Sequence, residues 1–249
     1  MAMSPRLLRP RATGFSPATI SGIANWWDAN DAATITLNAG AVETWSSKAG
    51  LRNAATQATA NNRPTTTTVN GKTAVYFDGV NDGLAFTGTA RTDETWIVAF
   101  AQLSAQSGQR MMIGETANGY GLTVSQAASQ KYIENSWGNF TEGSARMRVT
   151  YAVGASVAAG PAIASTVRSA ASGLFVFVDG TQRSSAINGA TNGTTSGSVS
   201  VTRMGSVSSA TQQFDGWIGE IICYNRPLSA SERMSVERYL GRKWGITVA

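Results

Sequence analysis

The sequence predicts an all-β fold in which two antiparallel sheets pack as a sandwich, with one short C-terminal helix and an extended N-terminal arm. Short runs rich in Val, Ile, Thr and aromatic residues recur along the 249 residues, separated by turns rich in Gly, Asn and Asp. Helical periodicity is convincing in one segment, near the C-terminus. Because chains of this length often form a single β-sandwich domain, we expect an arm at residues 1–14 and one domain at 15–249.

The closing segment of the chain combines a strand with that helix. A turn signal at Asp215-Gly216 precedes a run rich in Ile, Trp and Tyr, and Pro227 ends the run because proline has no amide hydrogen to donate. Ser229 and Glu232 have the spacing of a capping box, which predicts that a helix begins there. The expected apolar stripe of this helix is Val236, Tyr239, Leu240 and Trp244, with Arg233, Glu237, Arg238 and Arg242 outside it.

The other strands are predicted from alternation and composition. Residues 95–103 are apolar on both faces, which indicates a central covered strand, whereas residues 145–153 alternate as a half-buried strand does. Further strands are expected at 35–37, 71–77, 84–86, 110–113, 120–124, 173–179, 181–187 and 198–204, which makes roughly twelve to fourteen in all. Surface loops are expected at 54–68, 154–172 and 188–197, which are rich in small and polar residues.

Composition excludes several kinds of chemistry. The chain has no histidine, which removes Ser-His-Asp and Cys-His catalysis and histidine metal sites. Its one cysteine, Cys223, has no partner for a disulfide within the chain and is interpreted as a small buried strand residue. Most of the tryptophans fall in predicted elements and are expected in the core, namely Trp26, Trp27, Trp45, Trp96, Trp217 and Trp244.

Charge argues against nucleic-acid and membrane partners. The net charge is +5, from 20 basic and 15 acidic residues, but the bases are scattered and no stripe interleaves them with aromatic residues. No run approaches the ~20 apolar residues of a membrane span, and no signal-peptide core follows the first Met, so we expect synthesis in a cytoplasm. Charged residues make up only 14% of the chain, which fits either surface hidden in an assembly or a polar uncharged surface.

Four segments, in order, resemble the LamG-like domains of the concanavalin A-type jelly-roll fold. They are W-W-D-A-N-D at 26–31, F-D-G-V-N-D at 77–82, F-V-F-V-D-G at 175–180 and F-D-G-W-I-G-E-I-I-C-Y-N-R-P-L-S-A-S-E-R at 214–233. The resemblance implies a two-sheet jelly roll and a structural acid at Glu220. It leaves function open, because this fold hosts lectins, glycan hydrolases, adhesion modules and phage virion proteins.

The first 14 residues have neither helical nor strand periodicity, and their prolines and arginines predict an extended arm. One interpretation is a solvated tail. The other is an arm that docks on a partner, with Arg6, Arg9 and Arg11 reaching carboxylates while Leu7 and Leu8 fill a groove. The opening of the chain also resembles the starts of phage structural proteins that carry this domain.

Catalytic carboxylates are not evident. Glycan hydrolases of the fold that this chain resembles carry carboxylates that alternate along one strand, so that the acid and the nucleophile share a cleft. If this chain were such a hydrolase, the resemblance would imply the same spacing here. The near pairs in this sequence are Asp28/Asp31, Asp78/Asp82, Asp93/Glu94 and Glu232/Glu237, and none has that spacing on a predicted strand. Glu220 is alone on the last strand. Spacing leaves open a pair that meets across strands.

A calcium ion needs six to eight oxygen ligands, and relatives of this fold often hold one at a sandwich edge. Asp78, Asn81 and Asp82 could contribute such oxygens. The same spacing is typical of a turn in which Asp accepts backbone amides, and we favour that interpretation and expect no cofactor.

The best candidate for a glycan platform is the stretch E-N-S-W-G-N-F at 134–140, which we expect to be a loop. It offers Asn135, Trp137, Asn139 and Phe140, two amides and two rings suited to a sugar. The competing interpretation is that Trp137 and Phe140 cover the edge of the sandwich.

These observations favour a non-enzymatic bacteriophage virion protein. In this hypothesis the arm anchors the chain to capsid or tail proteins, and the jelly roll projects outward as a decoration or fibre component, as a homo-oligomer that binds host surface polysaccharide. The alternative is a stand-alone carbohydrate-binding, lectin-like module, and the third hypothesis is a glycan hydrolase or lyase.

Overall fold

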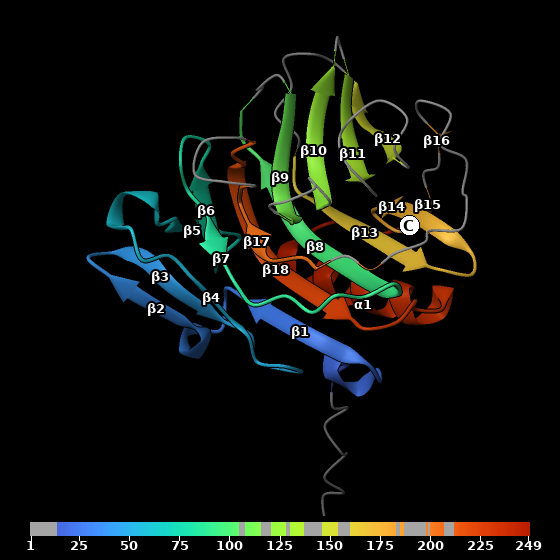
Figure 1. The fold of residues 1–249 in the computed structure, drawn as a ribbon, viewed down its shortest axis with the longest axis horizontal. Coiled ribbons are helices and arrows are strands. Elements are labelled where there is room, and N and C mark those ends of the chain that lie inside the picture. Colours follow the sequence, from blue (N-terminus) through green and yellow to red (C-terminus); the bar gives the residue numbers. More distant parts are fainter. Residues whose placement is uncertain are drawn as a thin grey trace, which may run out of the picture.

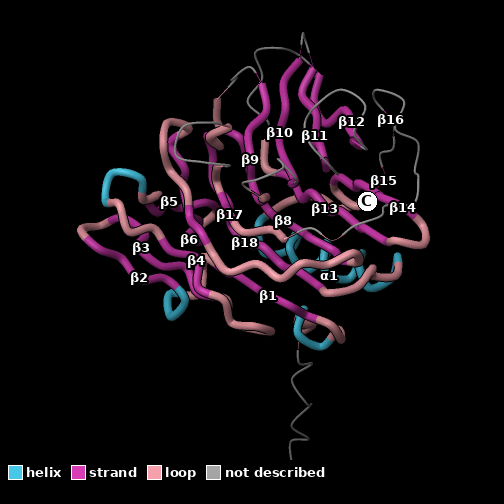
Figure 2. Tube along the Cα trace, in the orientation of Figure 1, coloured by secondary structure: helices cyan, strands magenta, loops and turns pink. Residues whose placement is uncertain are grey.

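The computed structural model describes residues 14–104, 108–115, 121–127, 130–136, 146–153, 160–182, 185–186, 198, 200–206 and 212–249. These residues form two antiparallel sheets, three short 3-10 helices and one α-helix (Figures 1 and 2). The predicted fold class, an all-β two-sheet sandwich of the jelly-roll type with one short C-terminal helix, is confirmed.

The first sheet has eight strands: β1 (Ile23–Asp28), β5 (Thr65–Val69), β6 (Lys72–Asp78), β8 (Glu94–Gln102), β13 (Ala162–Ser169), β14 (Gly173–Val178), β15 (Thr181–Gln182) and β18 (Asp215–Tyr224). Their spatial order is β15-β14-β13-β8-β18-β6-β5, and β1 also pairs with β18. The long strand β18, predicted from its Ile- and Trp-rich run, therefore joins β1, β6 and β8.

The second sheet has ten strands: β2 (Ile35–Asn38), β3 (Ala41–Ser46), β4 (Ala54–Thr56), β7 (Leu84–Ala85), β9 (Gly108–Gly114), β10 (Gly121–Ala127), β11 (Gln130–Ser136), β12 (Arg146–Val153), β16 (Ser185–Ala186) and β17 (Arg203–Met204). Their order is β16-β12-β11-β10-β9-β17-β7-β4-β3-β2. The helices are η1 (Pro17–Thr19), η2 (Ala32–Thr34), η3 (Ala60–Asn62) and α1 (Ala230–Trp244).

Strand β8 separates two apolar layers, as its uninterrupted apolar run predicts. Trp96, Val98 and Phe100 belong to the core between the sheets, together with buried Trp27 and Trp45. The alternate residues of β8, namely Ile97, Ala99 and Ala101, belong to a second core between the first sheet and α1. Since successive side chains of a strand point to opposite faces, the first sheet is the middle of three layers.

Helix α1 covers the outer face of the first sheet, where it contacts β8 and β13 (Figure 1). Its predicted capping box is present: Ser229 Oγ accepts from the amide of Glu232, and the Glu232 carboxylate accepts from the amide of Ser229. Val236, Leu240 and Trp244 are fully buried, as expected. Among the described residues, no helix is long and apolar enough to cross a membrane.

The buried face of α1 is wider than the predicted stripe. Arg233 and Glu237 are buried rather than solvent-facing. Arg233 Nη1 lies 2.5 Å from Glu237 Oε2, and the guanidinium carbon lies 3.6 Å from the centre of the Phe177 ring. Pairing and stacking explain how a charged residue can face a sheet.

Two loop predictions are wrong. Residues 54–68 contain β4, η3 and the start of β5, because the β-branched threonines 65–68 form an edge strand that pairs with β6. Residues 154–172 contain β13, which is buried throughout and lies between β8 and β14. The small residues of β13, such as Ala162 and Ala164, suit a strand covered on both faces, so composition alone was misleading here.

The tryptophan and cysteine predictions are confirmed. Trp26, Trp27, Trp45, Trp96, Trp217 and Trp244 are all buried. Cys223 is a free, fully buried thiol, and burial raises its pKa well above the ordinary value. It is therefore an apolar core residue in β18.

Candidate functional site

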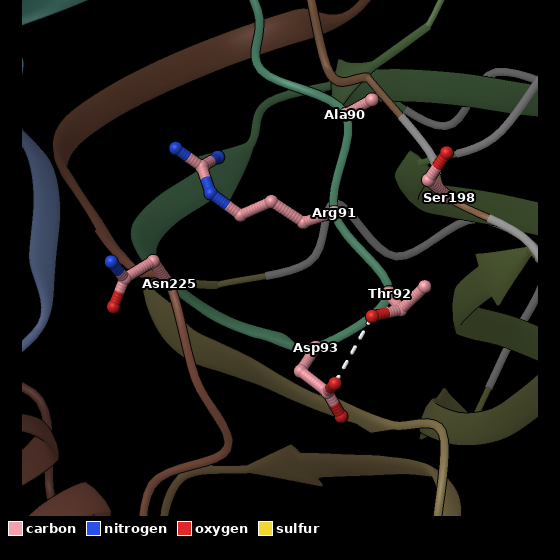
Figure 3. Close-up of a pocket in the computed structure, with 6 residues that line it drawn as sticks. All are labelled: Ala90, Arg91, Thr92, Asp93, Ser198 and Asn225. Atoms are coloured by element: carbon pink, nitrogen blue, oxygen red, sulfur yellow. Dashed lines mark hydrogen bonds between the residues drawn. The ribbon is translucent and has the colours of Figure 1, made fainter.

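A polar pocket of about 390 Å³ lies at one end of the first sheet and is lined by Ala90, Arg91, Thr92, Asp93, Ser198 and Asn225 (Figure 3). Residues 90–93 directly precede β8, and Asn225 directly follows β18. The start of β8 and the end of β18 are adjacent, since Thr95 pairs with Tyr224. The antiparallel pairing therefore places these two segments, more than 130 residues apart in sequence, beside one pocket.

A buried ion pair supports the loop of residues 91–93. Arg168 Nη1 of β13 lies 3.0 Å from Glu94 Oε1, and both side chains are about 6% exposed. The same guanidinium donates to the carbonyl oxygens of Arg91 and Thr92. Burial raises the pKa of Glu94, and the Arg168 charge opposes this. Removing either partner would leave a buried charge unpaired, which is costly. The ion pair therefore holds the Arg168 guanidinium, and with it the backbone of residues 91 and 92, in one position.

Asp93 is tied to the loop and to the neighbouring turn. Its Oδ1 accepts from the amide of Ala170 at 2.9 Å, and its Oδ2 accepts from Thr92 Oγ1 at 3.1 Å. Figure 3 shows the Asp93 carboxylate turned away from the Arg91 guanidinium. The acid therefore acts as a structural acceptor for the loop.

Asn225 is held at the opposite wall. Its backbone N–H donates to Gly22 O at 2.8 Å. Gly22 has φ +83°, and a Cβ at this position would lie 2.6 Å from Asn225 Oδ1. Glycine at position 22 is thus required both by the left-handed backbone conformation and by the close approach of the Asn225 side chain.

Three side chains of the pocket have hydrogen-bond donors that are free for a ligand. Within the described part of the chain, the one hydrogen bond of the Arg91 side chain is from Nη1 to Thr89 O, at 3.5 Å. The side chains of Ser198 and Asn225 are exposed and make no hydrogen bond to another described residue. A guanidinium with most of its five N–H donors free, beside an amide and a hydroxyl, suits a ligand rich in oxygen atoms.

A second depression, of about 460 Å³, lies between β14 and the start of α1. Phe175, Phe177, Pro227 and Leu228 contribute to its lining. Its cation, Arg233, is already paired with Glu237 and stacked on Phe177. This depression offers apolar surface with fewer uncommitted polar groups than the pocket at Arg91.

The predicted glycan platform is partly corrected. Asn135 lies in strand β11, where it pairs with Leu122 and Met147, rather than in a loop. The reason is that residues 130–136 complete the ladder between β10 and β12. Trp137, Asn139 and Phe140 lie outside the described residues, as do Arg6, Leu7, Leu8, Arg9 and Arg11 of the predicted arm.

The calcium candidates form a hydrogen-bonded turn. Asp78 Oδ1 accepts from the amides of Val80 and Asn81, and Asp82 Oδ2 accepts from the amide of Asp78 at 2.9 Å. Burial raises the pKa of Asp82 from 3.8 to about 6. Across the described ranges, no group of three or more His, Cys, Asp or Glu side chains is placed to hold a metal ion.

A carboxylate pair does meet across strands, at a place that sequence spacing missed. Asp28 of β1 is the register partner of Glu220 of β18. Lys243 Nζ lies 2.6 Å from Asp28 Oδ1 and 2.7 Å from Glu220 Oε2. Glu220 has no exposed surface and also accepts from Trp26 Nε1, Tyr239 Oη and Trp244 Nε1. The pair therefore lies buried under α1, away from the pocket.

Comparison with solved structures identifies the fold. The chain superposes on Trypanosoma rangeli sialidase (TM-score 0.56, 16% identity, 92% of this chain and 34% of that chain). It also superposes on domain 4 of AbnA, an extracellular arabinanase from Geobacillus stearothermophilus, in complex with arabinotriose (TM-score 0.56, 10% identity, 84% and 95%). A third match is the binding domain of botulinum neurotoxin serotype D (TM-score 0.59, 9% identity, 90% and 53%).

The chain spans about a third of the sialidase and nearly all of the arabinanase domain. No protein-family model matches the sequence, and no curated protein matches it either. At these identities the likeness shows the fold alone: the chain is a two-sheet antiparallel β-sandwich.

Proposed function

We propose that this chain is a carbohydrate-binding β-sandwich module that binds an oligosaccharide in the pocket of Arg91 and Asn225. The observation that carries the proposal is the pocket itself: a rigidly supported loop presents uncommitted polar side chains at the end of a packed sheet. Sugars are recognised by such convergent donors and acceptors on a preformed scaffold. The arabinotriose complex of the structurally similar arabinanase domain supports this at the level of fold analogy.

We propose binding rather than hydrolysis. Glycoside hydrolysis typically uses two carboxylates on either side of the scissile bond. Asp93 is the one acid among the described residues that line the pocket, and its oxygens already accept from Ala170 and Thr92. The buried pair of Asp28 and Glu220 is occupied by ion pairs with Lys243 and Lys48 beneath the helix.

A glycan array tests the proposal. Purified protein is expected to retain a restricted set of oligosaccharides, with affinity measured afterwards by calorimetry. Asn225→Ala should weaken binding about 2- to 10-fold, the worth of one hydrogen bond. Asn61→Ala, an exposed asparagine on η3, is the matched control and should bind as the unmodified chain does. Absence of binding to any glycan at millimolar concentration would refute the proposal.

We further propose that the module is presented on a bacteriophage virion, as a homo-oligomer attached to capsid or tail proteins. The observation that favours this is the opening of the chain, with Arg6, Leu7, Leu8, Arg9 and Arg11 in a Pro-containing arm that resembles phage structural proteins. Mass spectrometry of purified virions should detect the chain, and deletion of residues 1–14 should release it. A chain found only free in the lysate would instead support the stand-alone module.

A further inference from the structure

Arg91 is the one cation among the described residues that line the pocket. Its guanidinium makes one long hydrogen bond, 3.5 Å to Thr89 O, whereas the neighbouring Arg168 is fully used by Glu94 and two loop carbonyls. The backbone of Arg91 is fixed by Arg168, so the position of its side chain is anchored although the head group remains available. A planar guanidinium with free N–H groups matches a carboxylate in two parallel hydrogen bonds.

Neither acid next to Arg91 forms an ion pair with it in the described part of the chain. The Glu94 carboxylate is paired with Arg168, and the Asp93 carboxylate accepts from Ala170 and Thr92 and points away from Arg91 (Figure 3). Arg91 and Arg168 together balance the charges of Asp93 and Glu94, so an anion would be attracted by the uncovered Arg91 guanidinium and not by a local excess of positive charge. The net charge of +5 adds a long-range attraction for anionic polymers.

Neutral donors complete the site. Figure 3 shows the Arg91 guanidinium and the Asn225 side chain on one side of the backbone of residues 90–93, with Ser198 and Thr92 on the other side. An anionic group at Arg91 would leave Asn225 and Ser198 to bind hydroxyl groups of the same sugar or of the next one. The pocket therefore combines one cationic position with several hydroxyl-binding positions.

We propose that the ligand is an acidic oligosaccharide, and that Arg91 binds its carboxylate while Asn225 and Ser198 bind its hydroxyl groups. This inference rests on the proposed carbohydrate-binding function and specifies the class of sugar. Arg91 is then the residue that discriminates acidic from neutral glycans.

The test compares an array-positive acidic oligosaccharide with its carboxyl-reduced counterpart, on an array that also carries neutral and sulfated glycans. The acidic form should bind at least about 10-fold more tightly, and Arg91→Gln should remove that advantage by lowering its affinity about 10- to 100-fold, as for a charge-assisted hydrogen bond. Binding of the acidic form should weaken with added salt. Arg238→Gln, an exposed helix residue with the same change in net charge, should have no effect.

The outcomes separate the two proposals. Equal binding of acidic and carboxyl-reduced glycans, with Arg91→Gln unaffected, would overturn the acidic-sugar inference and leave carbohydrate binding intact. Preference for sulfated over carboxylated glycans would overturn the assignment of a carboxylate. Failure to bind any glycan would overturn both. Urea unfolding of Arg91→Gln is the folding control. An unchanged free energy of unfolding shows that the variant loses affinity without losing its fold.

Discussion

Lys243 Nζ lies 2.7 Å from Glu220 Oε2 and thereby joins the last turn of α1 to the middle of β18. The same ammonium lies 2.6 Å from Asp28 Oδ1, so one cation binds the carboxylates of two paired strands. Lys48 binds the other oxygen of Asp28 at 2.6 Å. This network fixes the helix to the first sheet on the face opposite the core between the sheets.

Replacing Lys243 by Met should lower the free energy of unfolding by about 3–5 kcal/mol, because two buried carboxylates lose their shared counter-ion. Urea unfolding followed by tryptophan fluorescence measures the loss. The neighbouring exposed Arg242→Met is the control, and its effect should stay within about 0.5 kcal/mol. A loss from Lys243→Met as small as that of the control would contradict the role of the network.

Asp82 should make stability depend on pH. Its pKa is raised from 3.8 to about 6, chiefly by burial, so the folded state binds more protons than the unfolded state between these values. The Asp82 contribution is therefore present at low pH and is lost as pH rises toward 6. In Asp82→Asn, whose side-chain oxygen can still accept from the amide of Asp78, this dependence should disappear. Identical pH profiles for both proteins would contradict the prediction.

Ser229 should contribute to helix stability as an N-cap. Its Oγ accepts from the amide of Glu232 at 3.3 Å, and Ser229→Ala should cost about 1 kcal/mol. Ser172→Ala, at an exposed turn where the hydroxyl makes no hydrogen bond to another described residue, serves as the comparison and should cost less than half as much. Thermal unfolding of both variants measures the difference. Equal midpoints would contradict the assignment of Ser229 as the N-cap.

Calcium should leave the turn of Asp78 and Asp82 unchanged. Both carboxylates accept backbone amides within the turn, so they already have partners without a cation. The melting temperature should be the same in EDTA and in millimolar CaCl₂, whereas Asp78→Ala should lower it in both. A rise in melting temperature with CaCl₂ that Asp78→Ala abolishes would instead establish a calcium site.

Local patterns predicted the parts of the fold whose neighbours lie close in sequence. The capping box at Ser229 and the two-sided apolar run of β8 needed no tertiary information. The prediction of a loop at residues 162–169 was wrong because small residues form a buried strand here only through tertiary contacts. Two neighbouring strands pair with them, and a helix covers the sheet. The prediction that Arg233 and Glu237 face solvent was wrong for a similar reason. Their ion pair offsets the cost of burying two charges, and sequence periodicity does not report it.

The candidate site could not be read from the sequence, because it is made by topology. Residues 91–93, Ser198 and Asn225 come from three connections that antiparallel pairing brings to one end of the first sheet. A signal was present in Asp93 and Glu94, two adjacent acids at the start of the central strand. Its partner Arg168 lies in a segment whose composition indicated a loop.

Amide chemical-shift mapping tests the central claim most directly. A ¹⁵N-labelled sample titrated with an oligosaccharide from the array should show its largest shifts at Arg91, Thr92, Asp93, Ser198 and Asn225, with side-chain shifts at Arg91. Shifts confined to the depression of Phe175 and Phe177, or to Asn135 and the residues that follow it, would contradict the assignment of the site.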